Sequence, residues 1–497
     1  MMRASGILFP ISSLPSKYGI GCFSGEAYQF IDQLVEAGQT YWQILPLGPI
    51  GYGDSPYQSF STFAGNPYYI NLEQLVSYGW LTKEECDAVD FGGNEQFVDY
   101  GKLYEGRYGL LKQAFLRSQI EDNEEFQKFL EENQDWIEDY ALYMALKNQN
   151  GGRCWDEWED DLRFRCPEIL NQKKEELKEE ILFYEFMQFE FRRQWFALKQ
   201  YANEKGIKII GDIPIYVSFD SADAWANKEL FQFDEGGRPI AVAGCPPDGF
   251  SATGQLWGNP LYRWDYHKET GYEWWMKRLA FCFSMYDTVR IDHFRGFDEY
   301  YSIPYGAETA VDGHWEQGPG IALFQKAAEL FKDKEIIAED LGYVTDTVRQ
   351  LVNDTGYPGM KVLEFAFDSR DSGSALDYLP HNYSENSVVY TGTHDNETVI
   401  GWFCNGLQDN ERAMVRDYLC DHFTPDEGMH IPMICGAMRS VAKLCIIPMQ
   451  DWLGYGNEAR MNTPSTSGEN WKWRLKKDEF SDQLITKIFS ITKRYGR

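Results

Sequence analysis

Eight short apolar runs recur along the 497-residue sequence, and each one ends in a polar or glycine-rich turn. The runs cover residues 6–9, 41–45, 207–217, 288–292, 335–340, 360–367, 387–393 and 443–449. Runs that are apolar at nearly every position indicate parallel strands buried on both faces. Amphipathic stretches at 321–331 and 345–353 precede two of the runs, and we expect them to form crossover helices.

Eight such strands joined by helices predict an α/β fold, namely a closed (β/α)8 TIM barrel. An open doubly wound sheet is the alternative, although the first run lacks the Gly-x-Gly-x-x-Gly sequence that would favour a nucleotide-binding fold. The length allows either two or three ordinary domains or one barrel with insertions. Because no low-complexity linker or repeat divides the sequence, we expect residues 1–497 to form a single catalytic barrel.

Two gaps between the runs are too long for a single crossover, and we expect both to be insertions at the carboxyl ends of strands. Residues 51–205 contain helix-forming stretches at 124–146 and 171–204, which predict an inserted, mostly helical subdomain that stops at Gly206. The second insertion, 218–287, contains a turn-rich segment rich in Pro and Gly. Its length and composition predict an active-site lid over residues 244–254.

The charge and hydropathy of the chain argue against two classes of partner. A formal net charge of −30 repels phosphate backbones and anionic lipids, so neither nucleic acid nor a membrane is expected as a partner. The longest apolar stretches, such as 445–449, are far shorter than the ~20 residues that a spanning helix needs. The N-terminal apolar stretch superficially resembles a signal peptide, but Pro10 interrupts it and no small-residue cleavage site follows.

The pattern of cysteines predicts the cellular compartment of the protein. Ten of them are scattered along the chain, without a Cys-x-x-Cys pair or a histidine at metal-binding spacing. In a chain of this size they indicate reduced thiols, and therefore a cytoplasmic protein without a zinc site. The sequence leaves open whether the protein is a monomer or a homodimer.

Carboxylates follow four of the eight apolar runs. The third run contains Asp212, the fourth ends in Asp292, the fifth ends in Glu339 and Asp340, and Asp395 follows the seventh. A single carboxylate at such a place is most often a helix cap or a solvated loop residue. In a (β/α)8 barrel, however, the carboxyl ends of all strands meet at one rim, so four carboxylates there predict an active site.

Converging carboxylates support either metal-assisted hydrolysis or glycoside chemistry. Only seven histidines are present, and only His293 and His394 lie at predicted strand ends. Arg290 precedes Asp292 by two residues and shares its strand face, where its charge is expected to keep Asp292 ionised and to repel a metal. The balance favours sugar chemistry without a metal or an organic cofactor.

Aromatic residues make up 16% of the chain and agree with a sugar site. Aromatic rings stack on the apolar faces of sugars, while polar side chains bind the hydroxyls. Several rings fall in the predicted loops, namely Tyr52, Tyr57, Phe250, Trp257 and Phe365. Trp257, which lies between glycines just after the predicted lid, is the strongest candidate for a sugar platform.

Several longer motifs carry a resemblance to a known family. They include Gly6-Ile-Leu-Phe-Pro-Ile-Ser-Ser-Leu-Pro, Trp42-Gln-Ile-Leu-Pro-Leu-Gly-Pro, Gly51-Tyr-Gly-Asp-Ser-Pro-Tyr-Gln, Gly211-Asp-Ile-Pro-Ile-Tyr-Val, Pro246-Pro-Asp-Gly-Phe-Ser, Arg290-Ile-Asp-His-Phe-Arg-Gly, Ala338-Glu-Asp-Leu-Gly and Thr393-His-Asp-Asn-Glu-Thr. In this order, over residues 3–475, the sequence resembles the 4-α-glucanotransferases, or amylomaltases, of glycoside hydrolase family 77. Since only residues 450–497 follow the eighth run, the C-terminal β-domain of amylase-type enzymes is expected to be absent.

The resemblance implies a role for each matching residue. Asp292 corresponds to the nucleophile that forms a β-glucosyl-enzyme, Glu339 to the general acid/base, and Asp395 to the carboxylate that binds the distorted sugar's hydroxyls. Arg290 and His394 correspond to hydrogen-bonding companions of this trio. The implied substrate contacts also include Tyr57 as the platform under the reacting glucose, Asp212 as its support, Asp248, Phe250, Gln255 and Trp257 in the acceptor-side lid, and Phe365 and Asn462 at the rim.

One departure concerns the segment after Asn462, where the family usually has Gly following Asn-x-Pro and this sequence has Ser465. The implied activity is retaining transfer of α-1,4-glucan segments from a donor to the 4-hydroxyl of an acceptor glucan or glucose. The expected partners are α-1,4-glucans and maltooligosaccharides. An amylase-like hydrolase, a non-catalytic glucan-binding protein and a metal-dependent barrel hydrolase remain as alternatives.

Overall fold

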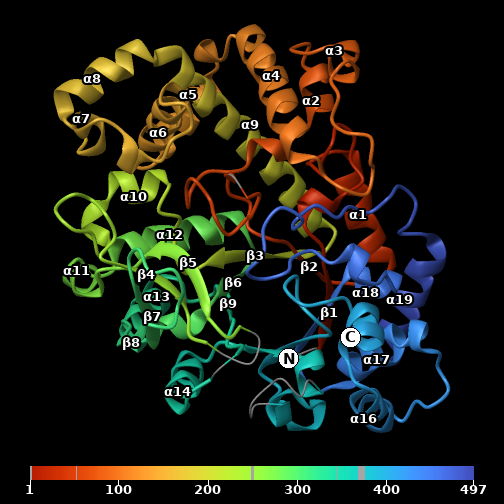
Figure 1. The fold of residues 1–497 in the computed structure, drawn as a ribbon. Coiled ribbons are helices and arrows are strands. Elements are labelled where there is room, and N and C mark those ends of the chain that lie inside the picture. The colour runs from red at the N-terminus through yellow and green to blue at the C-terminus, as the bar shows by residue number, and fades with distance from the viewer. Residues whose placement is uncertain (1–2, 52, 248–250, 343, 368–374) are drawn as a thin grey trace.

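Eight parallel strands close into a barrel in the order β1-β12-β11-β10-β9-β6-β3-β2 (Figure 1). The computed structural model describes residues 3–51, 53–247, 251–342, 344–367 and 375–497. The barrel strands are β1 (Ala4–Leu8), β2 (Tyr41–Gln43), β3 (Lys208–Pro214), β6 (Thr288–Asp292), β9 (Glu335–Ala338), β10 (Gly359–Val362), β11 (Ser387–Tyr390) and β12 (Leu444–Pro448). Each overlaps one of the eight predicted runs. The predicted (β/α)8 barrel is therefore confirmed.

The barrel strands are buried over most of their length, which explains their continuous apolar sequences. All residues of β11 and β12 are buried. Two predicted runs continue past the end of their strands, because the chain stays buried where it turns into the loops above the barrel. Within the run 360–367, strand β10 ends at Val362 and a 3-10 helix follows over Leu363–Ala366. Within the run 207–217, strand β3 ends at Pro214.

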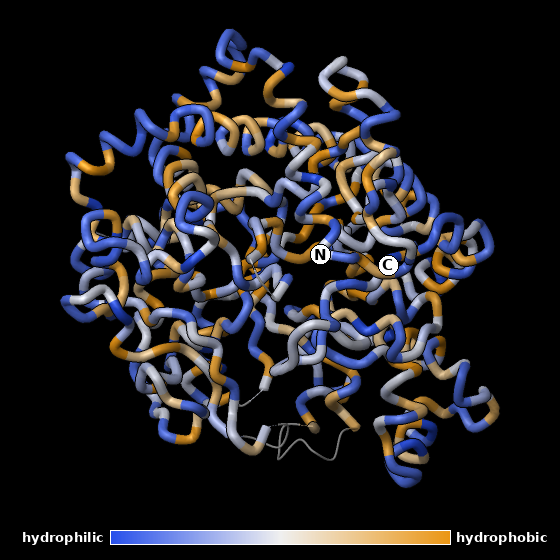
Figure 2. The backbone as a smooth tube through the Cα atoms, turned by 45° about the horizontal axis from the view of Figure 1, so that its top comes forward, coloured by the Kyte–Doolittle hydropathy of each residue, from blue (hydrophilic) through white to orange (hydrophobic). Residues whose placement is uncertain are grey.

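Helices surround the barrel and connect its strands (Figure 1). These are α1 (Gly25–Glu36), α12 (Glu273–Met285), α13 (Ile321–Leu330), α14 (Asp346–Thr355), α15 (Val399–Gly401), α16 (Asp409–Leu419) and α17 (His430–Arg439). The predicted crossover helices at 321–331 and 345–353 correspond to α13 and α14. Hydrophobic and hydrophilic segments alternate along the outer helices in Figure 2, as expected for helices that bury one face.

The chain between β2 and β3 is mostly helical and rises above the barrel in Figure 1. Its helices are α2 (Leu72–Ser77), α3 (Lys83–Asp87), α4 (Tyr100–Ser118), α5 (Glu124–Glu132), α6 (Ile137–Gln149), α7 (Asp160–Arg163), α8 (Pro167–Glu176) and α9 (Lys178–Glu204). The stretch 124–146 is two helices, because Asn133 ends α5 and its side-chain amide donates to the carbonyl of Phe129 at 2.7 Å. Helix α9 ends just before Gly206, whose φ of +82° suits glycine.

A four-stranded antiparallel sheet beside the barrel was not predicted. Its strands are β4 (Ala241–Cys245), β5 (Gln255–Pro260), β7 (Glu299–Pro304) and β8 (His314–Gln317), in the order β5-β4-β7-β8. The predicted lid segment 244–254 therefore connects the paired strands β4 and β5, where Cys245 lies opposite Gln255. Short helices α10 (Ala222–Ala226) and α11 (Trp264–Glu269) flank these two strands. The sheet extends past the predicted insertion boundary at 287, since β7 and β8 follow the barrel strand β6.

After the last barrel strand, residues 449–497 contain the helices α18 (Met449–Leu453) and α19 (Asp482–Arg494). The two ends of the described chain are joined beside the barrel. Arg497 donates to the carbonyl of Ala4 at 2.9 Å, and Arg3 donates to that of Tyr495 at 2.9 Å. In the described part of the chain, no helix combines the length and apolarity needed to cross a membrane.

Gly211 on β3 provides a test of how closely the barrel is packed. A Cβ atom at this position would lie 2.1 Å from the ring of Tyr286, which is 5% exposed and cannot move into solvent. Gly211→Ala should lower the free energy of unfolding by about 1–3 kcal/mol in denaturant titrations. The control is Gly25→Ala, where a Cβ meets nothing within 4 Å. Equal stabilities of the two variants would contradict the packing.

Candidate active site

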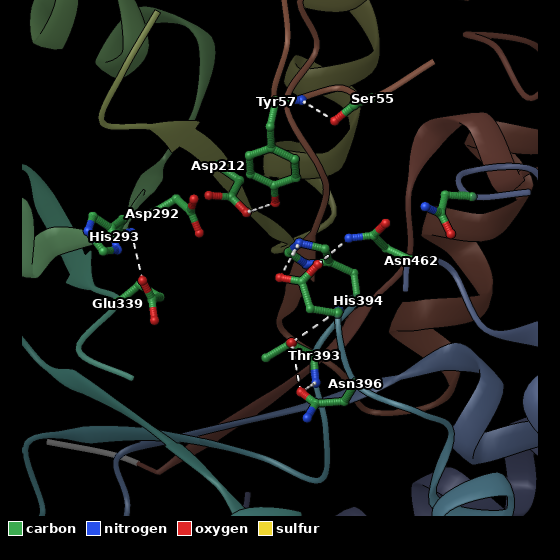
Figure 3. A network of polar contacts seen from close by, with 12 residues as sticks. Ser55, Tyr57, Asp212, Asp292, His293, Glu339, Thr393, His394, Asn396 and Asn462 are labelled. Carbon is green, nitrogen blue, oxygen red and sulfur yellow. Dashed lines mark hydrogen bonds and ion pairs between the residues drawn. The ribbon is translucent and has the colours of Figure 1, made fainter. Parts of the chain in front are cut away.

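The carboxylates predicted at four strand ends lie at one rim of the barrel. Asp212 belongs to β3, Asp292 ends β6, Glu339 follows β9 and Asp395 follows β11. Figure 3 shows Asp292 and Glu339 on one side, Tyr57 above Asp212, and His394 with Asn462 on the other side. The rim therefore carries a concentration of polar side chains.

Arg290 is the buried cation that joins two of these carboxylates. Its Nη1 atom donates to both oxygens of Asp212, at 2.7 and 2.6 Å, and its Nη2 atom lies 2.9 Å from Oδ1 of Asp292. The side chain of Asp212 is fully buried, whereas that of Asp292 is 28% exposed. One oxygen of Asp292 is therefore paired with the cation while the carboxylate remains open to the rim.

Tyr57 connects the loop after β2 to this cluster. Its hydroxyl donates to Oδ2 of Asp212 at 2.7 Å, so Asp212 accepts from both Tyr57 and Arg290. The Tyr57 ring stacks on the imidazole of His394, with centroids 5.2 Å apart and an interplanar angle of 15°. A flat aromatic surface consequently lies next to the carboxylates.

Asp395 is held from two sides. Its Oδ1 accepts from the side-chain amide of Asn462 at 2.6 Å, and its Oδ2 lies 3.2 Å from Nε2 of His394. Burial opposes ionisation, but the contacts with His394 and Asn462 hold the pKa of Asp395 well below its usual range. Asp395 raises the pKa of His394 in turn, against the effect of burial. Asn462 therefore positions Asp395 directly, a contact that the sequence did not indicate.

Glu339 is fixed by two backbone donors. Its Oε2 accepts from the N–H of His293 at 2.6 Å and its Oε1 from the N–H of Leu341 at 3.0 Å. His293 has a φ of +55°, a left-handed backbone conformation at the end of β6. Burial, followed by the charge of Asp292, raises the pKa of Glu339 to about 8 despite these donors.

Arg290 was expected to keep Asp292 ionised, but the pKa of Asp292 is raised above its ordinary value. Burial raises it to about 6, while Arg290 opposes the shift. The attraction is insufficient because Arg290 divides its charge between Asp292 and the fully buried Asp212. Between pH 6 and 8 the favoured state still has Asp292 ionised and Glu339 protonated.

The structure brings only some of the other predicted substrate-binding residues to this rim. The indole of Trp257 packs edge to face on the ring of His293, with centroids 4.8 Å apart, and donates to Oε1 of Gln255 at 3.0 Å. Phe365 lies just after β10, where its ring meets Tyr378 edge to face at 5.3 Å. Asp248 and Phe250 lie outside the described residues.

The sequence did not single out Trp471 as a site residue. Its buried ring lies 5.8 Å from the rings of both Tyr57 and His394. The motif Asn470-Trp-Lys-Trp473, only a few residues after Asn462, was the available signal. The nearby Ser465 has a φ of +63°, so the chain keeps the left-handed conformation at the place where the family usually has Gly.

Within the described ranges, no three His, Cys, Asp or Glu side chains are grouped as ligands for a metal ion. The observed arrangement is a pair of carboxylates with separated pKa values, a third carboxylate of low pKa, and aromatic rings at one barrel rim. This combination defines the class of (β/α)8 enzymes that act on glycosidic bonds.

Comparisons with known proteins place the chain within this class. The family model for glycoside hydrolase family 77, described as 4-alpha-glucanotransferase, matches residues 9–480. A 4-alpha-glucanotransferase of Clostridium butyricum is 48% identical over 98% of this chain and 99% of the relative, and one of Thermus thermophilus is 48% identical over 97% and 96%. The structure of an amylomaltase from Streptococcus agalactiae in complex with acarbose aligns with a TM-score of 0.95 at 42% identity, covering 100% of this chain and 99% of the other. The chain belongs to the 4-alpha-glucanotransferases of family 77.

The hydrogen bond between Tyr57 and Asp212 can be tested through stability. Tyr57→Phe keeps the ring but removes a donor from a fully buried carboxylate, so the free energy of unfolding should fall by about 1–3 kcal/mol. Tyr104→Phe is the matched control, because that tyrosine is 56% exposed. Denaturant titration of the two variants measures the difference, and a loss in Tyr104→Phe as large as that in Tyr57→Phe would refute the assignment.

Proposed function

We propose that the chain is a retaining 4-α-glucanotransferase, which moves α-1,4-glucan segments through a covalent glucosyl-enzyme. The observation that carries the proposal is the pair of neighbouring carboxyls with pKa values of about 6 for Asp292 and about 8 for Glu339. Near neutral pH such a pair supplies one ionised nucleophile and one proton donor. Membership of family 77 supports the same activity.

In the first half-reaction, an oxygen of Asp292 attacks the anomeric carbon of the donor sugar. The bond to the leaving oxygen breaks, and Glu339 gives that oxygen its proton, so the shortened glucan departs neutral. Arg290 holds one oxygen of Asp292 at 2.9 Å and thereby orients the carboxylate. The products are a glucosyl ester on Asp292 and an ionised Glu339.

In the second half-reaction, Glu339 acts as a base. It takes the proton from the 4-hydroxyl of an incoming glucan or glucose as that oxygen attacks the anomeric carbon, and Asp292 leaves as a carboxylate. Two inversions at the same carbon retain the α configuration. The N–H donors of His293 and Leu341 favour the ionised form of Glu339, which is the form this step requires.

The donor sugar is bound by the other side of the rim. Asp395 remains ionised and accepts hydrogen bonds from the sugar hydroxyls, with His394 beside it and Asn462 fixing its orientation. Tyr57 provides the apolar surface under the reacting glucose. Asp212 supports Tyr57 from the barrel strand below.

Acceptor binding is assigned to the segment around β5. Trp257 is proposed to stack on the acceptor sugar, since its ring lies against His293, the residue that follows Asp292. Gln255 fixes the indole through its Nε1 atom. Asp248, Phe250, Phe365 and the lid over 244–254 remain predicted acceptor-side or rim elements.

The proposed substrates are α-1,4-glucans and maltooligosaccharides, and the acarbose complex of the streptococcal amylomaltase supports a site for oligosaccharides. The reaction as derived uses only side chains of this chain and requires no cofactor. We place it in the cytoplasm, in the metabolism of starch, glycogen or maltooligosaccharides.

Transfer and hydrolysis are distinguished by the products formed from pure maltotriose. Water at ~55 M competes for the glucosyl-enzyme, so transfer requires an acceptor held in reactive alignment, an advantage worth several powers of ten. The enzyme should release glucose and build longer oligosaccharides with almost no gain in reducing ends, and Trp257→Ala should shift this ratio toward hydrolysis. Chromatography combined with a reducing-end assay measures both. Glucose and maltose alone, with reducing ends rising in step, would establish the amylase alternative.

The pH dependence of kcat/KM tests the two carboxylate roles. Activity should rise with pH through about 6 as Asp292 loses its proton, and fall through about 8 as Glu339 loses its own. Glu339→Gln should remove the alkaline limb and spare fluoride release from α-glucosyl fluoride, which needs no protonation of its leaving group. Glu335→Gln, at the opposite end of β9, is the control and should keep both limbs. An unchanged alkaline limb in Glu339→Gln would refute the role.

A further inference from the structure

The loop that carries His394 and Asp395 is anchored at both ends by one buried side chain. Asp451, in the first turn of α18, is 2% exposed. Its Oδ2 accepts from the hydroxyl of Thr391 at 2.6 Å, and its Oδ1 accepts from the N–H of Val399 at 2.8 Å. Thr391 and Val399 flank the loop 392–398, so a single carboxylate fixes the distance between the two ends of that loop.

The preceding residue, Gln450, holds a second segment that touches Asp395. Its side-chain amide donates to the carbonyl of Ala459 at 3.3 Å. Directly after Ala459, Arg460 donates to the backbone carbonyl of Asp395 at 2.7 Å, and Asn462 donates to the carboxylate at 2.6 Å. Gln450 and Asp451 are therefore hydrogen-bonded to the two segments around Asp395, the loop 392–398 and residues 459–462. We call these two segments the cradle of Asp395.

Hydrogen bonds of Thr391, Val399 and Asn396 fix the shape of this loop, and the rings of Tyr57 and Trp471 contact its His394. A cavity of about 20 Å³ is lined in part by Thr393, His394, Gln450, Asp451 and Arg460. The tip of the loop is rigid, because the side chain of Asn396 accepts from both the N–H and the hydroxyl of Thr393 at 2.8 Å (Figure 3). A rigid tip moves as a unit when its ends move, so the anchor at Asp451 sets the depth of His394 and Asp395.

The chemistry of the anchor explains why a carboxylate is present. Within the described residues Asp451 forms no ion pair, so its charge is buried at a cost and is stabilised by its two hydrogen bonds. Its two donors approach different oxygens, and a carboxylate accepts on both. An amide would keep both contacts only with the bond to Thr391 reversed, while an apolar side chain would lose both.

We propose that Asp451 is a positioning residue of the transfer reaction, which sets the location of Asp395 and His394 relative to the donor sugar. The inference rests on the proposed function, because it assumes that Asp395 binds that sugar. It predicts that loss of the anchor impairs the chemical step, since a displacement of about 1 Å in a group that orients the substrate can cost 10²-fold in rate.

The test compares Asp451→Leu, Asp451→Asn and Thr391→Val by their kcat and KM for maltotriose disproportionation, well below each variant's melting temperature. Asp451→Leu should lower kcat about 10²-fold with a smaller change in KM. Asp451→Asn should recover most of that loss, and Thr391→Val, which removes one contact, should lie between. Since Asp451→Leu can also impair folding, Asp451→Asn and Thr391→Val keep the test decisive: normal kcat in Thr391→Val would overturn the proposal.

Two further variants separate this inference from a general loss of stability and from the proposed function. Thr82→Ala removes the cap on the N–H of Glu85 at the start of α3, away from this loop, so it should lower stability by about 1 kcal/mol but leave kcat unchanged. Losses of kcat in Thr82→Ala that match those in Asp451→Leu would show a merely structural role. Asp395→Asn should be nearly inactive; if it remains active, the proposed function fails, whereas an inactive Asp395→Asn beside a fully active Asp451→Leu rejects the positioning role alone.

Discussion

The charge of Arg290 is the constraint around which the site is organised. The guanidinium donates to both oxygens of the buried Asp212 and also contacts Asp292, so the two carboxylates share its charge. A carboxylate paired fully with a cation would be a poor nucleophile. Because Asp292 receives only part of this attraction, burial raises its pKa to about 6; the group is still ionised near neutral pH, and the cation contacts its Oδ1. The same arrangement places a negative charge next to Glu339, and this charge, together with burial, keeps Glu339 protonated near neutral pH.

The barrel and its carboxylates were predictable because both follow from local patterns. Parallel strands buried on two faces must be apolar throughout, so β11 and β12 are visible in the sequence as uninterrupted runs. Barrel closure then brings the ends of all strands to one rim, so Asp212, Asp292 and Glu339 could be grouped without any knowledge of their contacts. The identity of each role came instead from the resemblance to family 77.

The features that were missed depend on contacts between distant parts of the chain. The antiparallel sheet pairs residues of β4 and β7 that are 57 to 63 positions apart, from Gly244 with Tyr301 to Ala241 with Pro304, and the half-exposed β5 and β8 lack a continuous apolar run. The left-handed backbone of His293 occurs without a glycine to indicate it. Likewise, the approach of Trp471 to Tyr57 requires the chain to return to the site after the barrel has closed. No local periodicity encodes such a return.

These late contacts couple the donor side of the site to closure of the barrel. Gln450 and Asp451 lie two and three residues after the end of β12, the strand that pairs with β1 and β11 to complete the ring. Arg497 adds a bond from the C-terminus to the carbonyl of Ala4 on β1. The contacts around Asp395 therefore depend on the pairing of β11 with β12. Asp292 and Arg290, in contrast, belong to β6 and depend on its pairing with β3 and β9. The proposed nucleophile, Asp292, and the proposed sugar-binding carboxylate, Asp395, thus come from strands that are not neighbours in the ring, and closure of the barrel holds them at a fixed separation.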